Sequence, residues 1–289
     1  MKYIITQMNI NQDVRNTNQW LYHRAVTSLV PQFIMVGTVY SKNHPFMLPM
    51  FEAWEQCILH IRAHFELMPT SPARPRFTIL DYAPTFAEIE LELSNLAAQA
   101  ANVLANPDAP PPIWPTLGDG LLQNVSPLHE DDLGQHTVQV VGDPAWLDRR
   151  DSIGGQTSHT WMAISLACFQ SLGLQPHYDI QPLWVHTVAR YALCLASQLG
   201  MHGFAHDAQS MAALQLRCIV DASRVYSVGC GDVMAHIARV GPRLASTQGL
   251  QLEGLLLADK AAARPRWWVN VAAPVIVLFA LLMTVDFMF

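Results

Sequence analysis

Apolar residues in the first quarter of the chain recur at helical spacing. Between Pro49 and Met68 they come three or four positions apart, at Phe51, Trp54, Ile58, Ile61 and Phe65. Such steps bring side chains to one face of an α-helix, so the pattern predicts an amphipathic helix over 49–68. Before it, the apolar and β-branched run FIMVGTVY at 33–40 predicts a buried strand.

The next region combines a helix start signal with a proline-rich stop. Thr85-Phe-Ala-Glu88 has the spacing of a capping box and is followed by good helix formers as far as Leu104. Prolines then crowd the sequence from 106 onward and end the helix, so a linker is expected over 106–135. The alternating residues 136–141 predict a short strand.

Beyond residue 156 the pattern turns helical. Glycines at suitable spacing predict helices over about 157–172, 182–199, 207–226, 231–247 and 250–262. Their short connections favour a bundle of neighbouring helices. In the first of them, one stripe is expected to form core packing: Trp161, Ile164, Cys168, Phe169 and Leu172.

The last apolar run, 267–285, carries no charge over nineteen residues. About 20 such residues span a bilayer, so it predicts a C-terminal transmembrane helix, with a buried helix of a globular domain as the alternative. Basic residues precede the run and none follows it, which places residues 1–266 on the cytoplasmic side, at the inner membrane in a bacterium. The expected anchor residues are Trp267, Trp268, Pro274, Phe279 and Leu282.

These patterns together predict a mainly α protein. A small N-terminal mixed α/β region occupies 1–105, the proline-rich linker 106–135, a cytoplasmic helical domain 136–266 and the membrane anchor 267–285. Hydrophobic residues make up 51% of the chain and charged residues only 14%. Such a composition favours apolar contacts with other protein subunits.

Net charge and short motifs limit the chemistry. A net charge of −6 disfavours nucleic acid as a partner, because phosphate backbones require a basic surface. The sequence has no P-loop, no G-x-G-x-x-G and no G-x-S-x-G nucleophile elbow, and we expect no cofactor. His60 and His64 lie one helical turn apart, a spacing able to bind zinc, but no third ligand is evident and a solvated helix face is the simpler interpretation.

Residues 156–262 resemble the helical domains of the HD superfamily, in particular its HDOD and HD-GYP branches. Three fragments carry the resemblance: LWVHTVARYALCLASQLG from 183, IVDASR from 219 and HIARVG from 236. HD enzymes hold metals with histidines and aspartates, and the resemblance leaves His186, Asp221 and His236 as the candidate metal-binding or catalytic residues. Val220 replaces the histidine of the family's His-Asp pair. The alternative is that all three are ordinary polar positions of a bundle.

Two functions follow from these observations. The first is a tail-anchored, non-catalytic scaffold or signalling module that binds protein partners at the membrane. Leu183, Trp184, Val188, Arg190 and Gly200 also resemble the order of residues in the coupling-complex subunit of type IVB secretion systems, which extends the first function to a conjugation or secretion complex. The second is a metal-dependent HD-type phosphohydrolase that uses His186, Asp221 and His236.

Overall fold

The computed structural model of the chain describes residues 3–7, 14–39, 49–67, 75–106, 108–182, 226–229 and 231–250. By its internal contacts the chain divides into two units, each assembled from three separate stretches. The sheet unit comprises Met1–Glu88, Asn124–Ser158 and Val220–Val233. The second unit comprises Ile89–Gln123, His159–Ile219 and Met234–Phe289.

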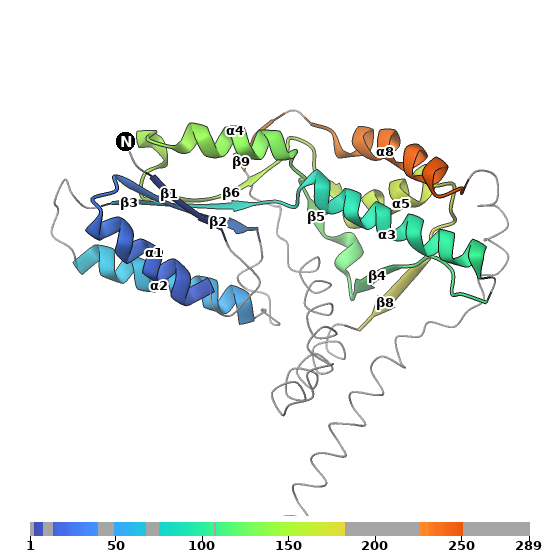
Figure 1. Cartoon of the computed structure of the whole chain (residues 1–289), viewed down its shortest axis with the longest axis horizontal. Coiled ribbons are helices and arrows are strands. Elements are labelled where there is room, and N and C mark those ends of the chain that lie inside the picture. Colours follow the sequence, from blue (N-terminus) through green and yellow to red (C-terminus); the bar gives the residue numbers. More distant parts are fainter. Residues whose placement is uncertain are drawn as a thin grey trace, which may run out of the picture. The chain divides into compact units, whose positions relative to one another are not determined.

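Strands and helices alternate through most of the sheet unit (Figure 1). Among the described residues, the strands are β1 (Tyr3–Gln7), β2 (Gln32–Thr38), β3 (Arg76–Tyr82), β4 (Trp114–Leu117), β5 (Asn124–Val125), β6 (Arg150–Gly154), β7 (His159–Thr160), β8 (Tyr178–Gln181) and β9 (Tyr226–Ser227). The helices are α1 (Val14–Thr27), α2 (Pro49–Leu67), α3 (Phe86–Ala105), α4 (Glu130–Val140), α5 (Trp161–Ser171) and α8 (Val233–Thr247), with 3₁₀ turns η1 (Gly120–Leu122) and η2 (Pro144–Trp146).

Five of these strands form a parallel sheet in the order β1-β2-β3-β6-β9. Ile34 pairs with Thr78, and Ile79 with Arg150. β2 and β3 are buried at nearly every position. Parallel strands carry helices on their faces, which is why both read as almost continuous apolar runs instead of alternating ones.

Each face of this sheet has its own helical cover. Figure 1 shows α1 and α2 on one face and α4 on the other. Side chains of a strand point alternately to the two faces. Phe33 of β2 accordingly lies 5.6 Å from Tyr22 of α1, ring centroid to ring centroid. On the opposite face, Ile34, Leu80 and Tyr82 form a core cluster with Leu128, Val140, Trp146 and Ile153.

The second unit contains its own small core. β4 and β8 pair in parallel, and Thr160 caps α5 by accepting a hydrogen bond from the Ala163 N–H at 3.1 Å. The stripe predicted along α5 is confirmed as core: Trp161, Ile164, Cys168, Phe169 and Leu172 are all at most 5% exposed. Trp161 also lies 6.5 Å from Trp114 of β4, between ring centroids.

The prediction of a mainly α fold is wrong. The helices expected over 49–68, 85–104, 157–172 and 231–247 are confirmed as α2, α3, α5 and α8, and the strand at 33–40 as β2. The parallel partners β1, β3, β6 and β9 were missed, and they make the chain an α/β protein. The helices expected over 182–199, 207–226 and 250–262 lie outside the described residues, apart from Pro182, Leu250 and Tyr226, and Tyr226 belongs to strand β9.

Two local predictions between residues 106 and 141 also differ from the structure. The expected linker contains β4, η1, β5 and the start of α4. The strand expected at 136–141 is wrong, because residues 136–140 continue α4 and Val141 is its C-cap. His129 caps this helix by accepting a hydrogen bond from the Asp131 N–H, and three acidic residues fill its first turn. Both features stabilise a helix N-terminus and outweigh the local alternation.

The predicted membrane location requires correction as well. Among the described residues, no helix combines the length and the apolar character needed to cross a bilayer. The run 267–285, with its anchor residues Trp267, Trp268, Pro274, Phe279 and Leu282, lies outside them. The structure therefore does not support a membrane anchor or a membrane partner, and both predictions are withdrawn.

Candidate functional site

A pocket of about 360 Å³ lies where two central strands of the sheet end. β2 ends at Thr38 and β3 at Tyr82, and parallel strands place their carboxyl ends at one edge. This edge is where open α/β sheets bind ligands. The sheet-edge pocket, as we call it, is lined by Val36, Gly37, Thr38, Tyr82, Ala83, Thr85, Glu88, Leu133, Gly134, Thr137 and Val138.

Helix α4 forms one wall of the sheet-edge pocket. Leu133, Gly134, Thr137 and Val138 recur at steps of three and four, which places them on one helix face. No heavy atom lies within 4 Å of the position that a Cβ would take at Gly134. The missing side chain therefore leaves open space on the pocket side of α4.

A chain of hydrogen bonds joins two lining residues, Tyr82 and Thr137, to His136. The Tyr82 hydroxyl lies 2.7 Å from Thr137 Oγ1 and 3.1 Å from His136 Nδ1. Thr137 Oγ1 donates its single proton to the Leu133 carbonyl at 2.8 Å, so it accepts from Tyr82. The Tyr82 oxygen then accepts from His136 Nδ1–H. These bonds fix the rotation of the Tyr82 hydroxyl.

Burial keeps both aromatic members of this chain uncharged. Desolvation raises the pKa of Tyr82 to about 12, against a smaller opposing effect of its hydrogen bond with Thr137. Desolvation also lowers the pKa of His136, although the nearby Asp151 carboxylate opposes it. The His136 ring lies edge-on to Trp146, with 5.0 Å between ring centroids. Near neutral pH, Tyr82 is therefore a hydrogen-bonding phenol and not a general base.

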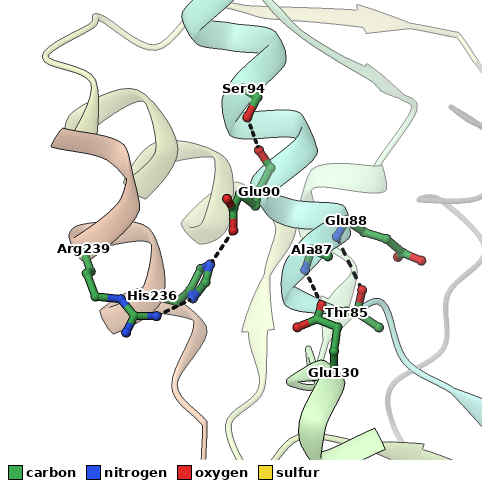
Figure 2. Close-up of polar contacts among 8 residues, drawn as sticks. All are labelled: Thr85, Ala87, Glu88, Glu90, Ser94, Glu130, His236 and Arg239. Carbon is green, nitrogen blue, oxygen red and sulfur yellow. Dashed lines mark hydrogen bonds and ion pairs between the residues drawn. The ribbon is translucent and has the colours of Figure 1, made fainter. Parts of the chain in front are cut away.

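The N-terminus of α3 supplies the acidic part of the pocket. Figure 2 shows Thr85, Ala87, Glu88 and Glu130 around this first turn. Thr85 Oγ1 accepts from the Glu88 N–H at 3.4 Å, which confirms the threonine half of the predicted capping box. Glu130 Oε1 accepts from the Ala87 N–H at 2.5 Å. Two of the free N–H groups of the helix end are thus satisfied.

The two carboxyl groups at this turn differ in pKa. Desolvation and the charge of Glu130 raise the pKa of Glu88, and the Thr85 hydrogen bond opposes them only in part. For Glu130, desolvation is outweighed by hydrogen bonds from Ala87 and Thr85 and by His129, so its pKa is lowered. Glu130 therefore holds its negative charge more firmly than Glu88 does.

His236 is the one described member of the three candidate residues; it belongs to the second unit and is not among the residues that line the sheet-edge pocket. Its Nε2 is 3.2 Å from Glu90 Oε2 and its Nδ1 is 3.2 Å from Arg239 Nη2 (Figure 2). A guanidinium only donates, so Nδ1 accepts and Nε2 carries the proton that Glu90 receives. These bonds connect α8 to α3. His186 and Asp221 lie outside the described residues.

Histidines do gather elsewhere, on the outer helices of the sheet unit. His23 of α1 faces both members of the predicted pair on α2, with ring centroids 5.9 Å from His60 and 4.9 Å from His64. Over the described ranges, however, no group of three or more His, Cys, Asp and Glu is arranged to hold a metal ion. Desolvation and the two neighbouring histidines lower the pKa of His64.

Sequence reasoning missed the residues of the sheet-edge pocket. Tyr82 ends an apolar run, RFTILDY, that reads as a short buried strand. Glu130, Asp131 and Asp132 are an acidic first turn, and they precede Thr137 by two turns of a helix. Both signals were present in the sequence. The sequence does not show that these two segments lie side by side, because their contact depends on the parallel pairing of distant strands.

Comparison with known proteins defines the class of fold. No protein-family model matches the sequence, and no curated protein matches it. A nucleoside-diphosphate-sugar epimerase from Staphylococcus aureus is similar in structure, with a TM-score of 0.50 and 13% identity over 86% of this chain and 76% of that one. An NADPH-dependent quinone oxidoreductase from Escherichia coli has a TM-score of 0.52 and 10% identity over 83% of this chain and 76% of the other.

At these identities the likeness concerns the fold, which is Rossmann-like and shared with epimerases and reductases. The resemblance of 156–262 to HD-superfamily helical domains is therefore wrong. The same finding contradicts both predicted functions. These were a scaffold or secretion-complex subunit and, as the alternative, an HD-type phosphohydrolase. The expectation that the chain is more likely not an enzyme is corrected too, because its fold is one that epimerases and reductases share.

Proposed function

We propose that this chain binds the small polyhydroxylated substrate of an epimerase- or reductase-like enzyme, and that the sheet-edge pocket holds that substrate. The observation that carries the proposal is the pocket's lining at the carboxyl ends of β2 and β3. Four hydroxyl residues, Thr38, Tyr82, Thr85 and Thr137, share it with one carboxylate and several small apolar groups. Sites of this kind combine apolar walls with a few fixed polar groups.

The chemistry of the lining suits a sugar-like molecule. Hydroxyl side chains both donate and accept hydrogen bonds, as the hydroxyls of a polyol do. The pocket volume of about 360 Å³ is at the small end of ligand sites and fits a single sugar ring more readily than a large ligand. One structural neighbour is named as a nucleoside-diphosphate-sugar epimerase, which supports the same substrate class.

The described residues do not fit the dinucleotide that this fold class implies. The five described strands of the sheet follow one another in chain order, so they contain no reversal point of the kind where dinucleotides bind. The sequence has no G-x-G-x-x-G, and the pocket lining has no lysine or arginine to face a pyrophosphate. Substrate binding is the role that these residues support.

Calorimetric titration of the full chain with D-glucose and with D-galactose tests this function. Thr137→Val removes the hydroxyl that accepts from Tyr82, and we expect it to weaken sugar binding about five- to tenfold, as for the loss of one hydrogen bond of about 1 kcal/mol. Thr247→Val is the matched control, because Thr247 also donates to the carbonyl four residues earlier at 2.8 Å.

Two results would overturn the proposal. One is that neither sugar binds to the full chain. The other is that Thr137→Val and Thr247→Val change the sugar affinity equally, since Thr247 lies on α8, outside the sheet-edge pocket.

A further inference from the structure

The charge that lines the sheet-edge pocket is negative. Of its eleven lining residues, Glu88 is the charged one, and no lysine, arginine or histidine is among them. The polar lining is otherwise hydroxyl-bearing and neutral. The electrostatic preference of the pocket is therefore set by Glu88 and by the charges nearest to it.

Glu130 adds a second negative charge close to the first. It precedes Gly134 by four positions and Thr137 by seven, so it lies on the face of α4 that lines the pocket. Its carboxylate is held in place by the Ala87 N–H, next to Glu88 in the sequence (Figure 2). Because its hydrogen bonds lower its pKa, Glu130 remains ionised and repels a negative charge at Glu88.

We infer that the substrate carries a protonated amine, as an amino sugar does, and that the Glu88 carboxylate binds this ammonium group. The inference rests on the proposed function, whose substrate class it narrows. An ammonium offers three donors and one positive charge, and Glu88 is an acceptor at the edge of a hydroxyl-lined pocket. The cation also relieves the repulsion between the Glu88 and Glu130 carboxylates.

The same charges select against anionic substrates. A phosphate or a carboxylate on the sugar would meet Glu88 and Glu130 with no lysine, arginine or histidine in the lining to compensate. Like-charge contacts of this kind are a common source of specificity. Sugar phosphates and uronates are therefore expected to bind more weakly than the neutral sugar.

Three probes of the same ring size test the inference on the full chain. Calorimetric titration at pH 7 compares D-glucosamine, D-glucose and D-glucuronate. We expect glucosamine to bind at least about tenfold more tightly than glucose, with glucuronate the weakest. The preference for glucosamine is expected to shrink at high salt, because screening weakens exposed charge pairs.

Glu88→Gln supplies the second half of the test. This change keeps the shape of the side chain and removes its charge, so the ratio of glucosamine affinity to glucose affinity is expected to fall to about one. Asp131→Asn is the matched control. It removes the same charge from an exposed residue next to Glu130 that does not line the pocket, and it should leave the ratio near its original value.

The outcomes separate the two claims. If no probe binds, the proposed function fails and the inference with it. If glucose binds but glucosamine binds no more tightly, or if Glu88→Gln and Asp131→Asn change the ratio equally, the inference is wrong and the proposed function stands. The three-probe ranking on the unmodified chain decides the question even where Glu88→Gln lowers stability.

Discussion

The two faces of the parallel sheet are held by different chemistry. On the face covered by α1 and α2, a partly buried ionic cluster joins β3, β6 and α2: Arg150 lies 2.6 Å from Asp81 and 2.6 Å from Glu55. On the face covered by α4, neutral hydrogen bonds do the corresponding work. Gln32 donates to Thr78 at 3.0 Å and accepts from the Gly142 N–H at 2.8 Å.

This difference between ionic and neutral contacts is related to the position of the candidate site. The α4 face ends at the sheet-edge pocket, and two of its buried polar side chains, Tyr82 and His136, are uncharged near neutral pH. The α1/α2 face carries the charged cluster and the histidines His23, His60 and His64. The charges of the α4 face are the partly exposed ion pair of Arg149 with Asp151 and, near the pocket, the carboxylates of Glu88 and Glu130.

The largest effect is expected from breaking the ionic cluster. Arg150→Met leaves Asp81, which is 5% exposed, and Glu55 without the guanidinium between them. Removing one partner of a buried ion pair costs about 3–5 kcal/mol. Urea denaturation measures the change. The double variant Arg150→Met with Asp81→Leu should recover part of the loss, and a single variant that costs under about 1 kcal/mol would contradict this view of the face.

A smaller effect is expected on the opposite face. Gln32→Leu removes the acceptor for the Gly142 N–H and the donor to Thr78 within a buried network. Leaving such groups unsatisfied costs about 1–3 kcal/mol, so the neutral network should cost less to break than the ionic one. Thr27→Val, at an exposed hydrogen bond of α1, is the control and should change the unfolding free energy by under about 0.5 kcal/mol. The comparison fails if Gln32→Leu is the more damaging of the two.

Gly134→Ala is expected to stabilise the chain while narrowing the pocket. Glycine inside a helix costs about 0.5–1 kcal/mol relative to alanine, and the added methyl meets no atom within 4 Å. Thermal or urea unfolding should therefore shift toward higher stability. Gly155→Ala is the opposite case, because its Cβ would clash with the Pro127 carbonyl oxygen. A destabilising Gly134→Ala would show that the space beside α4 is filled.

The smallest effect is expected on the loss of stability at acidic pH. Desolvation, His23 and His60 lower the pKa of His64 in the folded chain below its ordinary value of 6.5. The unfolded chain then binds more protons at this position than the folded chain does. The contribution of neutral His64 to the unfolding free energy is therefore complete above pH 6.5 and is lost as the pH falls below that value. Because His64 is only partly buried, we expect the unfolding free energy to change by under about 1 kcal/mol. His64→Gln should flatten the decline in urea midpoint between pH 7.5 and 5.5, and an unchanged slope would contradict it.

Local sequence patterns predicted elements well and their assembly poorly. The helix α2 with its buried Ile58 and Ile61, the capping threonine of α3 and the core residues of α5 follow from spacing alone. β3 was missed because a short apolar run buried on both faces has no period that distinguishes it from a loop or helix segment. Without β3, the remaining helices favoured a bundle, and the fragments around His236 gained a family resemblance that the fold does not support.

The candidate site was harder still to predict. Tyr82 and His136 are 54 positions apart, and no local signal pairs them. Their contact requires β3 to lie inside the sheet and α4 to cover it, with Val140 reaching the core beside Leu80. The residues proposed from sequence, His186, Asp221 and His236, rested on spacing between helices. Of these, the described His236 bonds to Glu90 and Arg239 instead.

The order in which the chain is synthesised has a consequence for the sheet unit. Arg150 and its partner Asp81 are separated by 69 positions, and β9 joins only near residue 226. A nascent chain that has emerged through β3 therefore exposes an apolar strand edge until much later residues arrive. Unpaired edges of this kind invite association between chains. Folding is expected to be slow, because distant pairings delay the transition state. Expression at reduced temperature, or with chaperones in excess, should accordingly raise the yield of folded protein.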